Sequence, residues 1–237
     1  MSALKKEENG KNGLLPPRIK AALGIRSHEV EPWRIFKILS EFVQGFELIR
    51  QYKKAVTFFG SARCGLETRI YKEAVVLAGH LAKDGYAVMT GGGQGIMEAA
   101  NKGAREAGGD SVGINIKLDK EQRINEYVTD SEAFHYFFTR KVMLSFASDL
   151  YVFFPGGFGT LDEFFEMITL VQTKKIPAIP IILINKEFWT PLLKYIEEVL
   201  YEKNNAINKD DMKIYNLVDN ADEAYELIKK LTAKQSS

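Results

Sequence analysis

A buried strand, a glycine loop and a helix N-terminus follow one another between Leu150 and Glu163. The segment reads LYVFFPGGFGTLDE: an apolar run ends at Pro155, three glycines come within four residues, and a helical pattern opens at Thr160. Free backbone N–H groups and the positive end of a helix dipole meet at such a junction, which therefore favours an anion. An anion site that also holds the carboxylate of Glu163 indicates chemistry on a phosphorylated substrate.

Short apolar segments alternate with amphipathic ones along most of the chain. This alternation predicts an α/β fold that is Rossmann-like and doubly wound, a mainly parallel sheet with helices on both faces. The expected strands lie at 55–59, 86–90, 111–116, 150–154 and 179–184. The expected helices lie at 70–83, 96–107, 140–148, 161–174, 190–203 and 221–231. In such sheets ligands bind at the carboxyl ends of the strands.

Two parts of the chain differ in composition. Residues 1–30 are rich in Lys, Glu, Asn and Gly, and Pro16-Pro17 interrupts any helix there, so we expect a flexible or loosely docked tail. Residues 31–237 are expected to form a single domain. It begins with a helix over 32–52, whose apolar residues fall at helical spacing and should cover the sheet or a partner subunit.

Composition argues against several classes of protein. The net charge of +1 gives no field for nucleic acid or an anionic membrane. With one cysteine and three histidines, a metal site is not expected. No apolar stretch approaches the roughly 20 residues that span a bilayer, and the polar N-terminus lacks the apolar core of a signal peptide. We therefore expect a cytoplasmic protein without a metal, a membrane partner or a nucleic-acid partner.

Three glycine loops follow expected strands, at 60–63, 91–95 and 155–160. The dinucleotide fingerprint needs Gly or Ala at its sixth position, but 93–98 ends in Glu and 157–162 ends in Asp. The G-x-x-x-x-G-K-[ST] loop of nucleoside triphosphatases is absent as well. The loops therefore indicate phosphate or ribose rather than NAD or ATP, and no cofactor is expected. A tight turn is the plain alternative at 155–160, although a turn needs one glycine and not three.

Glu163 has two interpretations that the spacing leaves open. Thr160-Leu161-Asp162-Glu163 fits a capping box, with Thr160 as the N-cap and Glu163 reaching back to it, which would stabilise the helix without any chemistry. The alternative is a carboxylate that acts on the bound substrate. A helical wheel places Glu163 away from the apolar face, hence outside the core, and Glu166 as a solvated or supporting residue.

Arg140 and Lys141 form a second unusual feature. Thr139 is a plausible N-cap, which would place both cations in the first turn of a helix, where they oppose the helix dipole. Local rules are broken most often at functional sites, so an anionic or carboxylate partner is expected. A solvated surface pair is the alternative, and His135 nearby is expected to be a packed or surface histidine.

These residues resemble the signature of a known family. Residues 155–163, PGGFGTLDE, are similar to the PGGxGTxxE motif of the LOG family, named for the "lonely guy" cytokinin-activating enzymes. Arg140-Lys141 occupies the place of its Arg-Lys pair, 91–97 that of its GGGxxGxM-type loop, and 60–63 that of its first-strand loop. The resemblance covers roughly residues 55–230.

The resemblance implies a phosphoribohydrolase. Such an enzyme cleaves the N-glycosidic bond of nucleoside 5′-monophosphates, AMP or cytokinin riboside 5′-monophosphates, to free base and ribose 5-phosphate. It also implies a homodimer or a higher homo-oligomer. The family's older label, lysine decarboxylase, does not suit this chain, because nothing in it resembles a pyridoxal phosphate site. Glu98, where plant members have Gly, and the long N-terminal segment set the chain apart from the short plant-type proteins.

The resemblance also implies roles for individual residues. Glu163 and Arg140 would be the catalytic pair. By spacing, Glu121 looks like an acidic substrate contact that precedes the arginine in the family. The implied substrate-binding residues are Gly91, Gly92, Gly93, Gly95, Met97, Glu98, Glu121, Lys141, Pro155, Gly156, Gly157, Phe158, Gly159 and Thr160.

The mechanistic hypothesis places the 5′-phosphate on the backbone N–H groups of 156–160. Glu163 would stabilise an oxocarbenium-like state or activate water, and Glu98 or Glu121 would bind ribose hydroxyls or the base. Arg140 would hold Glu163 or a ribose hydroxyl and keep Glu163 ionised by lowering its pKa. The competing hypothesis is a nucleotide-binding or sensor protein of the same fold without turnover.

Overall fold

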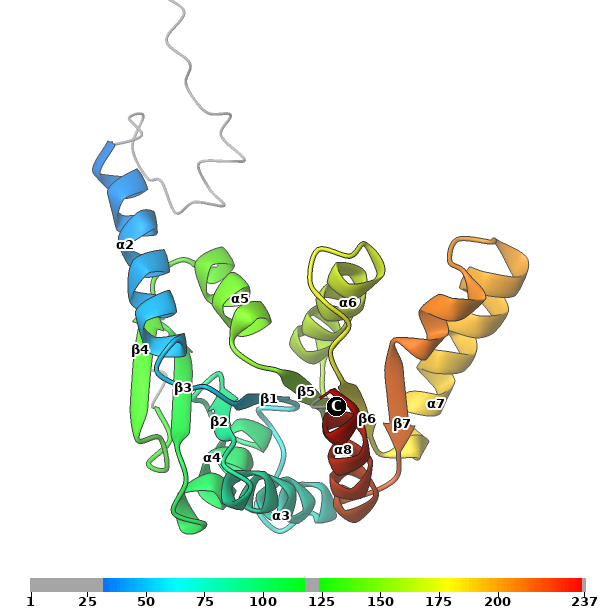
Figure 1. Cartoon of the computed structure of the whole chain (residues 1–237), viewed down its shortest axis with the longest axis horizontal. Coiled ribbons are helices and arrows are strands. Elements are labelled where there is room, and N and C mark those ends of the chain that lie inside the picture. Colours follow the sequence, from blue (N-terminus) through cyan, green and yellow to red (C-terminus); the bar gives the residue numbers. More distant parts are fainter. Residues whose placement is uncertain (1–31, 118–123, 236–237) are drawn as a thin grey trace, which may run out of the picture.

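The computed structural model describes residues 32–117 and 124–235. A parallel sheet of seven strands forms the centre of this part of the chain (Figure 1). The strands are β1 (Ala55–Phe59), β2 (Ala87–Thr90), β3 (Ser111–Ile116), β4 (Asp130–Phe134), β5 (Leu150–Phe153), β6 (Ile181–Ile184) and β7 (Tyr215–Val218). Their order is β4-β3-β2-β1-β5-β6-β7, so the chain winds outward from β1 in both directions. The expected doubly wound α/β fold is confirmed, whereas the expected tail lies outside the described residues.

Helices cover both faces of the sheet (Figure 1). They are α2 (Pro32–Ile49), α3 (Arg69–Lys83), α4 (Ile96–Glu106), α5 (Phe137–Phe146), α6 (Phe158–Gln172), α7 (Lys186–Tyr195) and α8 (Ala221–Gln235). A π-helix, Ile196–Lys203, continues α7, and a short 3-10 helix, Lys209–Lys213, precedes β7. In Figure 1, α3, α4 and α8 lie below the sheet, and α2, α5 and α6 lie above it.

Alternating strand residues build two cores. Val56 and Phe58 of β1 point to one face, and Ala55 and Phe59 point to the other. The lower core adds Leu77, Leu81, Ile96, Ala100, Ala224 and Ile228 from α3, α4 and α8. The upper core adds Leu48, Met143, Phe164, Met167 and Trp189 from α2, α5, α6 and α7. The inner strands are almost entirely buried because both faces of the sheet are covered.

The sequence did not predict β4 and β7, the two strands at the edges of the sheet. β4 and β7 have only one fully buried residue each, Phe134 and Val218. An edge strand has a neighbour on one side only, so its residues need not form the continuous apolar run that marks an inner strand.

Three helices begin several residues earlier in the structure than the sequence predicted. α5 begins at Phe137 rather than 140, and α6 begins at Phe158 rather than 161. The segment expected as one helix over 190–203 begins at Lys186 and changes to π-helix at Ile196.

The two halves of the winding meet at β1 and β5. Phe59 pairs with Phe153 in parallel register, and Phe154 N–H donates to the Phe59 carbonyl at 2.8 Å. The loops that follow both strands therefore leave the sheet side by side at its carboxyl edge. This is the switch point at which doubly wound folds bind ligands.

Candidate active site

The loop after β1 joins the other two glycine loops. Ser61 N–H donates to the Pro155 carbonyl at 3.0 Å, and the Ser61 carbonyl accepts from Ile96 N–H, also at 3.0 Å. Gly95 has a φ of +69° and packs so closely that a Cβ there would lie 2.8 Å from the Ala62 carbonyl carbon. The backbone of one residue, Ser61, thus connects three loops that are distant in the sequence.

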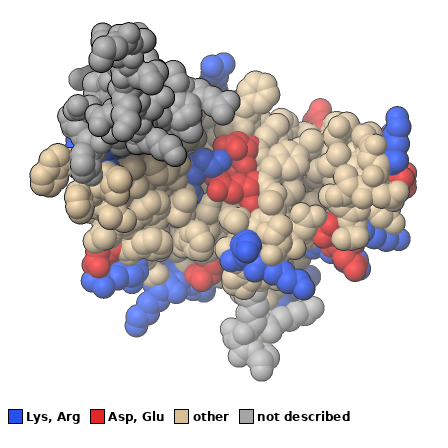
Figure 2. Space-filling view, turned by 90° about the horizontal axis from the view of Figure 1, so that it is seen from above, with Lys and Arg blue, Asp and Glu red and all other residues tan. Residues whose placement is uncertain are grey.

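A pocket of about 850 Å³ lies where these loops meet. Its polar side consists of the loop after β5, the N-terminus of α6 and two arginines, and its apolar side of aromatic and aliphatic side chains. The lining residues are Phe58, Phe59, Gly60, Ser61, Ala62, Arg63, Gly91, Met97, Phe137, Arg140, Leu144, Pro155, Gly156, Gly157, Phe158, Gly159, Thr160, Glu163 and Phe188. Figure 2 looks down on the side that carries α5 and α6, where acidic side chains gather beside basic ones near the middle.

The N-terminus of α6 opens into this pocket. Gly157 is the N-cap, and no side chain caps the helix. The predicted capping box is therefore wrong, because Thr160 is the third residue of α6 and packs over Gly156, where a Cβ would lie 2.6 Å from the Thr160 Cβ. The first-turn N–H groups remain without a capping side chain, as an anion site requires.

Glu163 is buried on α6, with 6% of its surface exposed. The expectation that it lies outside the core is wrong: α6 packs against α5 as well as the sheet, so a residue beside the apolar stripe is still covered. Among the described residues, its Oε2 atom has no hydrogen-bond partner. Glu163 also lines the pocket, and its carboxylate is not held by a hydrogen bond at Oε2 within the described structure.

The pKa of Glu163 is raised from 4.5 to about 7. Burial is the main cause, and it outweighs the lowering by Lys141 and Arg140, while the neighbouring carboxylates Glu166 and Asp162 raise the pKa further. Arg140 lowers the pKa of Glu163, as expected, but the expectation that this keeps Glu163 ionised at its ordinary pKa is wrong. Desolvation of the charged form exceeds the attraction of the two cations.

Arg140 extends from α5 to the glycine loop after β2. Its Nε donates to the Ile114 carbonyl at 2.9 Å. Gly91 has no side chain where the guanidinium lies, since a Cβ there would overlap Arg140 and sit 2.8 Å from Met97 Sδ. Burial lowers the pKa of Arg140, and Glu163 partly restores it. Among the described residues no ion pair joins Arg140 to Glu163, although both line the same pocket.

The N-terminus of α5 differs from the prediction. Tyr136 is the N-cap, and Thr139 lies inside the helix, where its hydroxyl donates to Glu41 Oε2 at 2.6 Å and lies 2.7 Å from the Tyr136 carbonyl. The predicted Thr139 cap is thus wrong. Arg140 and Lys141 are the fourth and fifth residues of α5, just past its first turn.

Lys141 does not line the pocket and instead connects α5 to α6. Its Nζ forms ion pairs with Asp162 and with Glu166, the latter at 3.2 Å. Glu166 is consequently a supporting residue, 26% exposed at its side chain.

The second glycine loop is shaped by a buried polar network. Gly92 N–H donates to Thr90 Oγ1 at 2.9 Å, and Asn125 Nδ2 donates to the Gly93 carbonyl at 2.8 Å. Asn101 Oδ1 accepts from both Thr90 Oγ1 (2.7 Å) and Asn125 Nδ2 (3.0 Å). Gly92 and Gly93 therefore belong to a rigid loop behind the pocket wall rather than to its lining.

The predicted site residues divide into three groups. Those that line the pocket are Gly91, Met97, Arg140, Pro155, Gly156, Gly157, Phe158, Gly159, Thr160 and Glu163. Those that do not are Gly92, Gly93, Gly95, Glu98 and Lys141. Glu98 accepts a hydrogen bond from the Tyr71 hydroxyl at 3.3 Å, and its expected contact with ribose or base stays a prediction. Glu121 lies outside the described residues.

Sequence reasoning missed part of the lining. Arg63 and Ser61 belong to the first-strand loop, which was noted as a motif without being assigned to the site. Phe137, Leu144 and Phe188 come from α5 and α7, and no local signal marks them as site residues.

Comparisons with known proteins agree with this architecture. A family model described as "Possible lysine decarboxylase" matches residues 97–228, more than half of the chain. The chain belongs to this family, the LOG family. A cytokinin riboside 5′-monophosphate phosphoribohydrolase of Rhodococcoides fascians is 28% identical over 156 residues, 65% of this chain and 79% of that protein. The rice enzyme of that name, LOG, is 29% identical over 184 residues, 76% of this chain and 73% of its own.

Solved structures share the fold. The molybdenum cofactor binding protein from Rippkaea orientalis superposes with a TM-score of 0.57 at 23% identity, covering 76% of this chain and 98% of its own. In the described part of this LOG family member, no helix is long and apolar enough to cross a membrane.

Proposed function

We propose that this LOG family protein hydrolyses the N-glycosidic bond of nucleoside 5′-monophosphates, releasing the free base and ribose 5-phosphate. The substrates would be AMP, cytokinin riboside 5′-monophosphates, or both. The observation that carries the proposal is the buried carboxyl of Glu163, whose Oε2 has no hydrogen-bond partner in the described part of the chain, in the same pocket as the N-terminus of α6, which no described side chain caps. The names of the relatives support the same reaction class.

The phosphate end of the substrate suits the loop after β5. Gly156, Gly157 and Gly159 leave backbone N–H groups free of side-chain bulk, and the helix dipole of α6 favours negative charge there. Arg63, at the rim of the pocket, adds a positive charge. A phosphate held here directs the ribose toward Glu163, which lies one helical turn further along α6.

Glu163 suits proton transfer. With a pKa near 7, it is partly ionised at neutral pH, the condition under which a general base is most effective. The carboxylate takes a proton from water as the water oxygen bonds to C1′ of the ribose. The bond between C1′ and the base nitrogen breaks, its electron pair leaves with the base, and the base takes up the proton that Glu163 has removed from the water. Before that proton is transferred, the negative charge of the carboxylate stabilises the oxocarbenium-like transition state.

Arg140 suits a positioning and charge-balancing role. Its Nε is occupied by the Ile114 carbonyl, which fixes the side chain, while the guanidinium nitrogens beside Gly91 face the pocket. A cation held in this way binds a ribose hydroxyl or the ionised Glu163 once substrate has expelled water.

The residues do not fit the decarboxylase description of the family model. A pyridoxal phosphate enzyme needs a lysine that forms a Schiff base with the cofactor. Of the described residues that line the pocket, none is a lysine, and Lys141 is engaged in ion pairs with Asp162 and Glu166 of α6. The described lining therefore lacks the amine on which that chemistry depends.

We also propose that the protein is a homodimer or a higher homo-oligomer. α2 turns a row of large apolar side chains to solvent: Trp33, Ile35, Phe36, Leu39, Val43 and Phe46 are each 48–74% exposed. A continuous apolar surface of this kind usually marks a contact with another protein chain.

The test is a panel of nucleoside 5′-monophosphates incubated with the protein, with released ribose 5-phosphate as the readout. We expect release from at least one purine nucleotide by the wild type, and loss of release in Glu163→Gln and Arg140→Ala. Glu202→Gln, an exposed glutamate on the π-helix, is the matched control. If the protein binds nucleotides but releases ribose 5-phosphate from none of them, it is a non-catalytic binding protein.

A further inference from the structure

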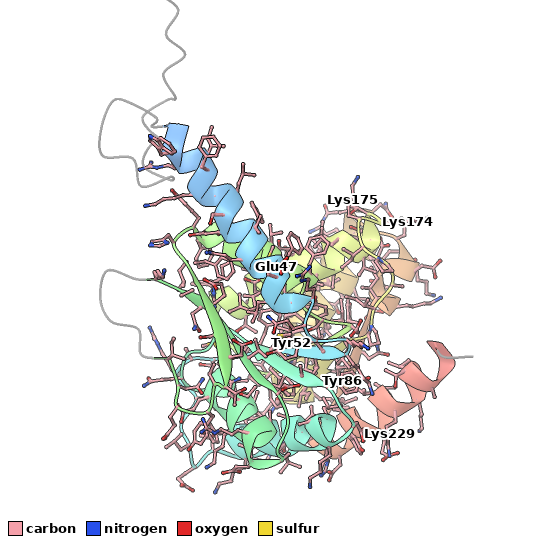
Figure 3. The ribbon with its side chains drawn as sticks, turned by 60° about the vertical axis from the view of Figure 1, so that its left-hand side comes forward. Glu47, Tyr52, Tyr86, Lys174, Lys175 and Lys229 are labelled. Atoms are coloured by element: carbon pink, nitrogen blue, oxygen red, sulfur yellow. The ribbon has the colours of Figure 1, made fainter. Side chains whose placement is uncertain are left out.

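α2 carries a buried carboxylate on the side opposite its exposed apolar row. Glu41 is 6% exposed and points at the N-terminus of α5. Figures 1 and 3 show α2 along one side of the molecule, next to β4 and α5. At the carboxyl end of α2, the Tyr52 hydroxyl donates to Asp130 Oδ2 at 2.8 Å, so β4 holds this end of the helix (Figure 3).

Glu41 provides the cap that α5 lacks in its own sequence. The N-cap residue Tyr136 forms no side-chain capping bond. Instead, Glu41 Oε1 accepts from His135 N–H at 2.7 Å, and Oε2 accepts from Tyr136 N–H at 3.3 Å and from the Thr139 hydroxyl at 2.6 Å. Backbone N–H groups at a helix start need such acceptors, and a negative charge there also suits the helix dipole.

The carboxylate is held in its charged form. Burial raises the pKa of Glu41, but the hydrogen bonds from Thr139, His135 and Tyr136 outweigh it, and the pKa lies below its ordinary value. Oε2 is bonded at the start of α5, and Oε1 accepts from the N–H of His135 just before it, with His135 Nδ1 3.1 Å away. Glu41 therefore forms a fixed attachment between α2 and the first turn of α5.

That first turn determines where Arg140 lies. Arg140 follows Thr139 directly, and its N–H donates to the carbonyl of the N-cap Tyr136 at 3.2 Å. The guanidinium must then fit between the Ile114 carbonyl and the space left by Gly91. A small rotation of the helix start would move the charged end of this long side chain out of that space.

We propose that Glu41 is a positioning residue for the reaction: it fixes the start of α5 and, through it, the guanidinium of Arg140 in the active-site pocket. The proposal rests on the proposed function, in which Arg140 acts in the pocket. Glu41 lies outside residues 97–228, the part that the family model matches. α2 is thereby part of the catalytic apparatus and more than a cover for the sheet.

The test is a double-mutant cycle between positions 41 and 140. We expect Glu41→Ala to lower kcat for nucleotide hydrolysis about tenfold or more, because misplacement of a catalytic group by about 1 Å has effects of this size. Glu41→Gln, which keeps one acceptor oxygen, should lower kcat less than Glu41→Ala does. In an Arg140→Ala background, Glu41→Ala should change the residual rate less than about twofold, since the group it positions is gone.

Two controls separate positioning from general stability. Glu47→Gln alters a glutamate on the same helix that forms a surface ion pair with Arg50, and it should leave kcat unchanged (Figure 3). Thr139→Val removes one donor to Glu41 while keeping the shape of the side chain, so it should reproduce part of the decrease in kcat. This variant still tests the proposal if Glu41→Ala does not fold. Far-ultraviolet circular dichroism and thermal unfolding confirm folding of each variant at the assay temperature.

Three results would overturn the proposal. The first is an unchanged kcat in Glu41→Ala. The second, which applies if Glu41→Ala does not fold, is an unchanged kcat in Thr139→Val. The third is that Glu41→Ala lowers kcat by the same factor in the wild-type and Arg140→Ala backgrounds. The last would show that Glu41 acts on stability alone. A fully active Arg140→Ala would contradict the proposed role of Arg140 itself, which is a different failure.

Discussion

Glu163 is buried, lacks a hydrogen-bond partner at Oε2 among the described residues, and has carboxylates as well as cations around it. Its charged form is therefore less stable in the folded protein than in the unfolded chain. The folded pKa of about 7 lies above the ordinary 4.5, so the folded state retains a proton between these values while the unfolded chain has lost it. Stability from this group is complete below about pH 4.5 and is lost as the pH rises toward 7.

Glu163→Gln should remove the loss of folding stability that Glu163 causes as the pH rises. We expect the variant to match the wild type at pH 4 and to exceed it at pH 8, by up to about 3 kcal/mol in the free energy of unfolding. Urea unfolding at both pH values measures the difference. If the two proteins differ equally at pH 4 and pH 8, the raised pKa of Glu163 is contradicted.

The same residue shows how far sequence reasoning extends. The motif placed Glu163 at the start of a helix beside a glycine loop, but the capping interpretation assumed that Thr160 is the N-cap. The N-cap is Gly157, three residues earlier, and glycine serves there without a capping side chain. Burial of Glu163 depends on α5, which the local pattern of α6 does not contain.

Gly91 directly follows β2 and leaves the space that the guanidinium of Arg140 occupies. A Cβ at this position would overlap the guanidinium and crowd Met97 Sδ. We expect Gly91→Ala to lower kcat/KM about tenfold or more by displacing Arg140, with little change in thermal stability. Gly65→Ala is the control, since its Cβ would have an ordinary 3.7 Å contact with Thr68. Wild-type activity in Gly91→Ala would mean that the guanidinium position is unimportant.

The polar network behind the second glycine loop is the other element-scale feature. Asn101 is fully buried and joins Thr90, Ser111 and Asn125. Asn101→Ala should destabilise the fold by about 2–4 kcal/mol, because several buried polar groups lose their partners at once. Asn216→Ala, which removes one long hydrogen bond of 3.4 Å, should cost less than about 1 kcal/mol. Similar losses for both variants in urea unfolding would refute this account of the network.

The elements themselves were predictable to different degrees. β1 and β3 were predicted with the limits that they have in the structure, and both are inner strands whose residues are almost all buried. β4 and β7 lie at the edges and lack that continuous burial. The cap of α5 could not be predicted at all, since it comes from Glu41, about 95 residues earlier in the chain. Long-range contacts of this kind leave no local pattern.

At the scale of the whole molecule, the exposed apolar row of α2 is the feature that an isolated chain does not explain. The double variant Phe36→Glu/Val43→Glu places two charges in the middle of this row. It should lower the mass in solution to that of a monomer without unfolding the chain. Val76→Glu is the control, because Val76 is 43% exposed on α3, on the opposite side of the sheet. Light scattering after size exclusion measures the mass. A wild type that is monomeric at all concentrations, or an unchanged mass in the double variant, would contradict the proposed oligomer.

The central claim is that the pocket at the β1–β5 switch point hydrolyses nucleoside 5′-monophosphates through Glu163. Its most direct test is release of ribose 5-phosphate from AMP and from a cytokinin riboside 5′-monophosphate by the wild type and by Glu163→Gln. We predict release by the wild type from at least one of the two, and a loss of about 10²-fold or more in the variant with nucleotide binding retained. Equal rates in the two proteins, or no release from either substrate by the wild type, would contradict the account.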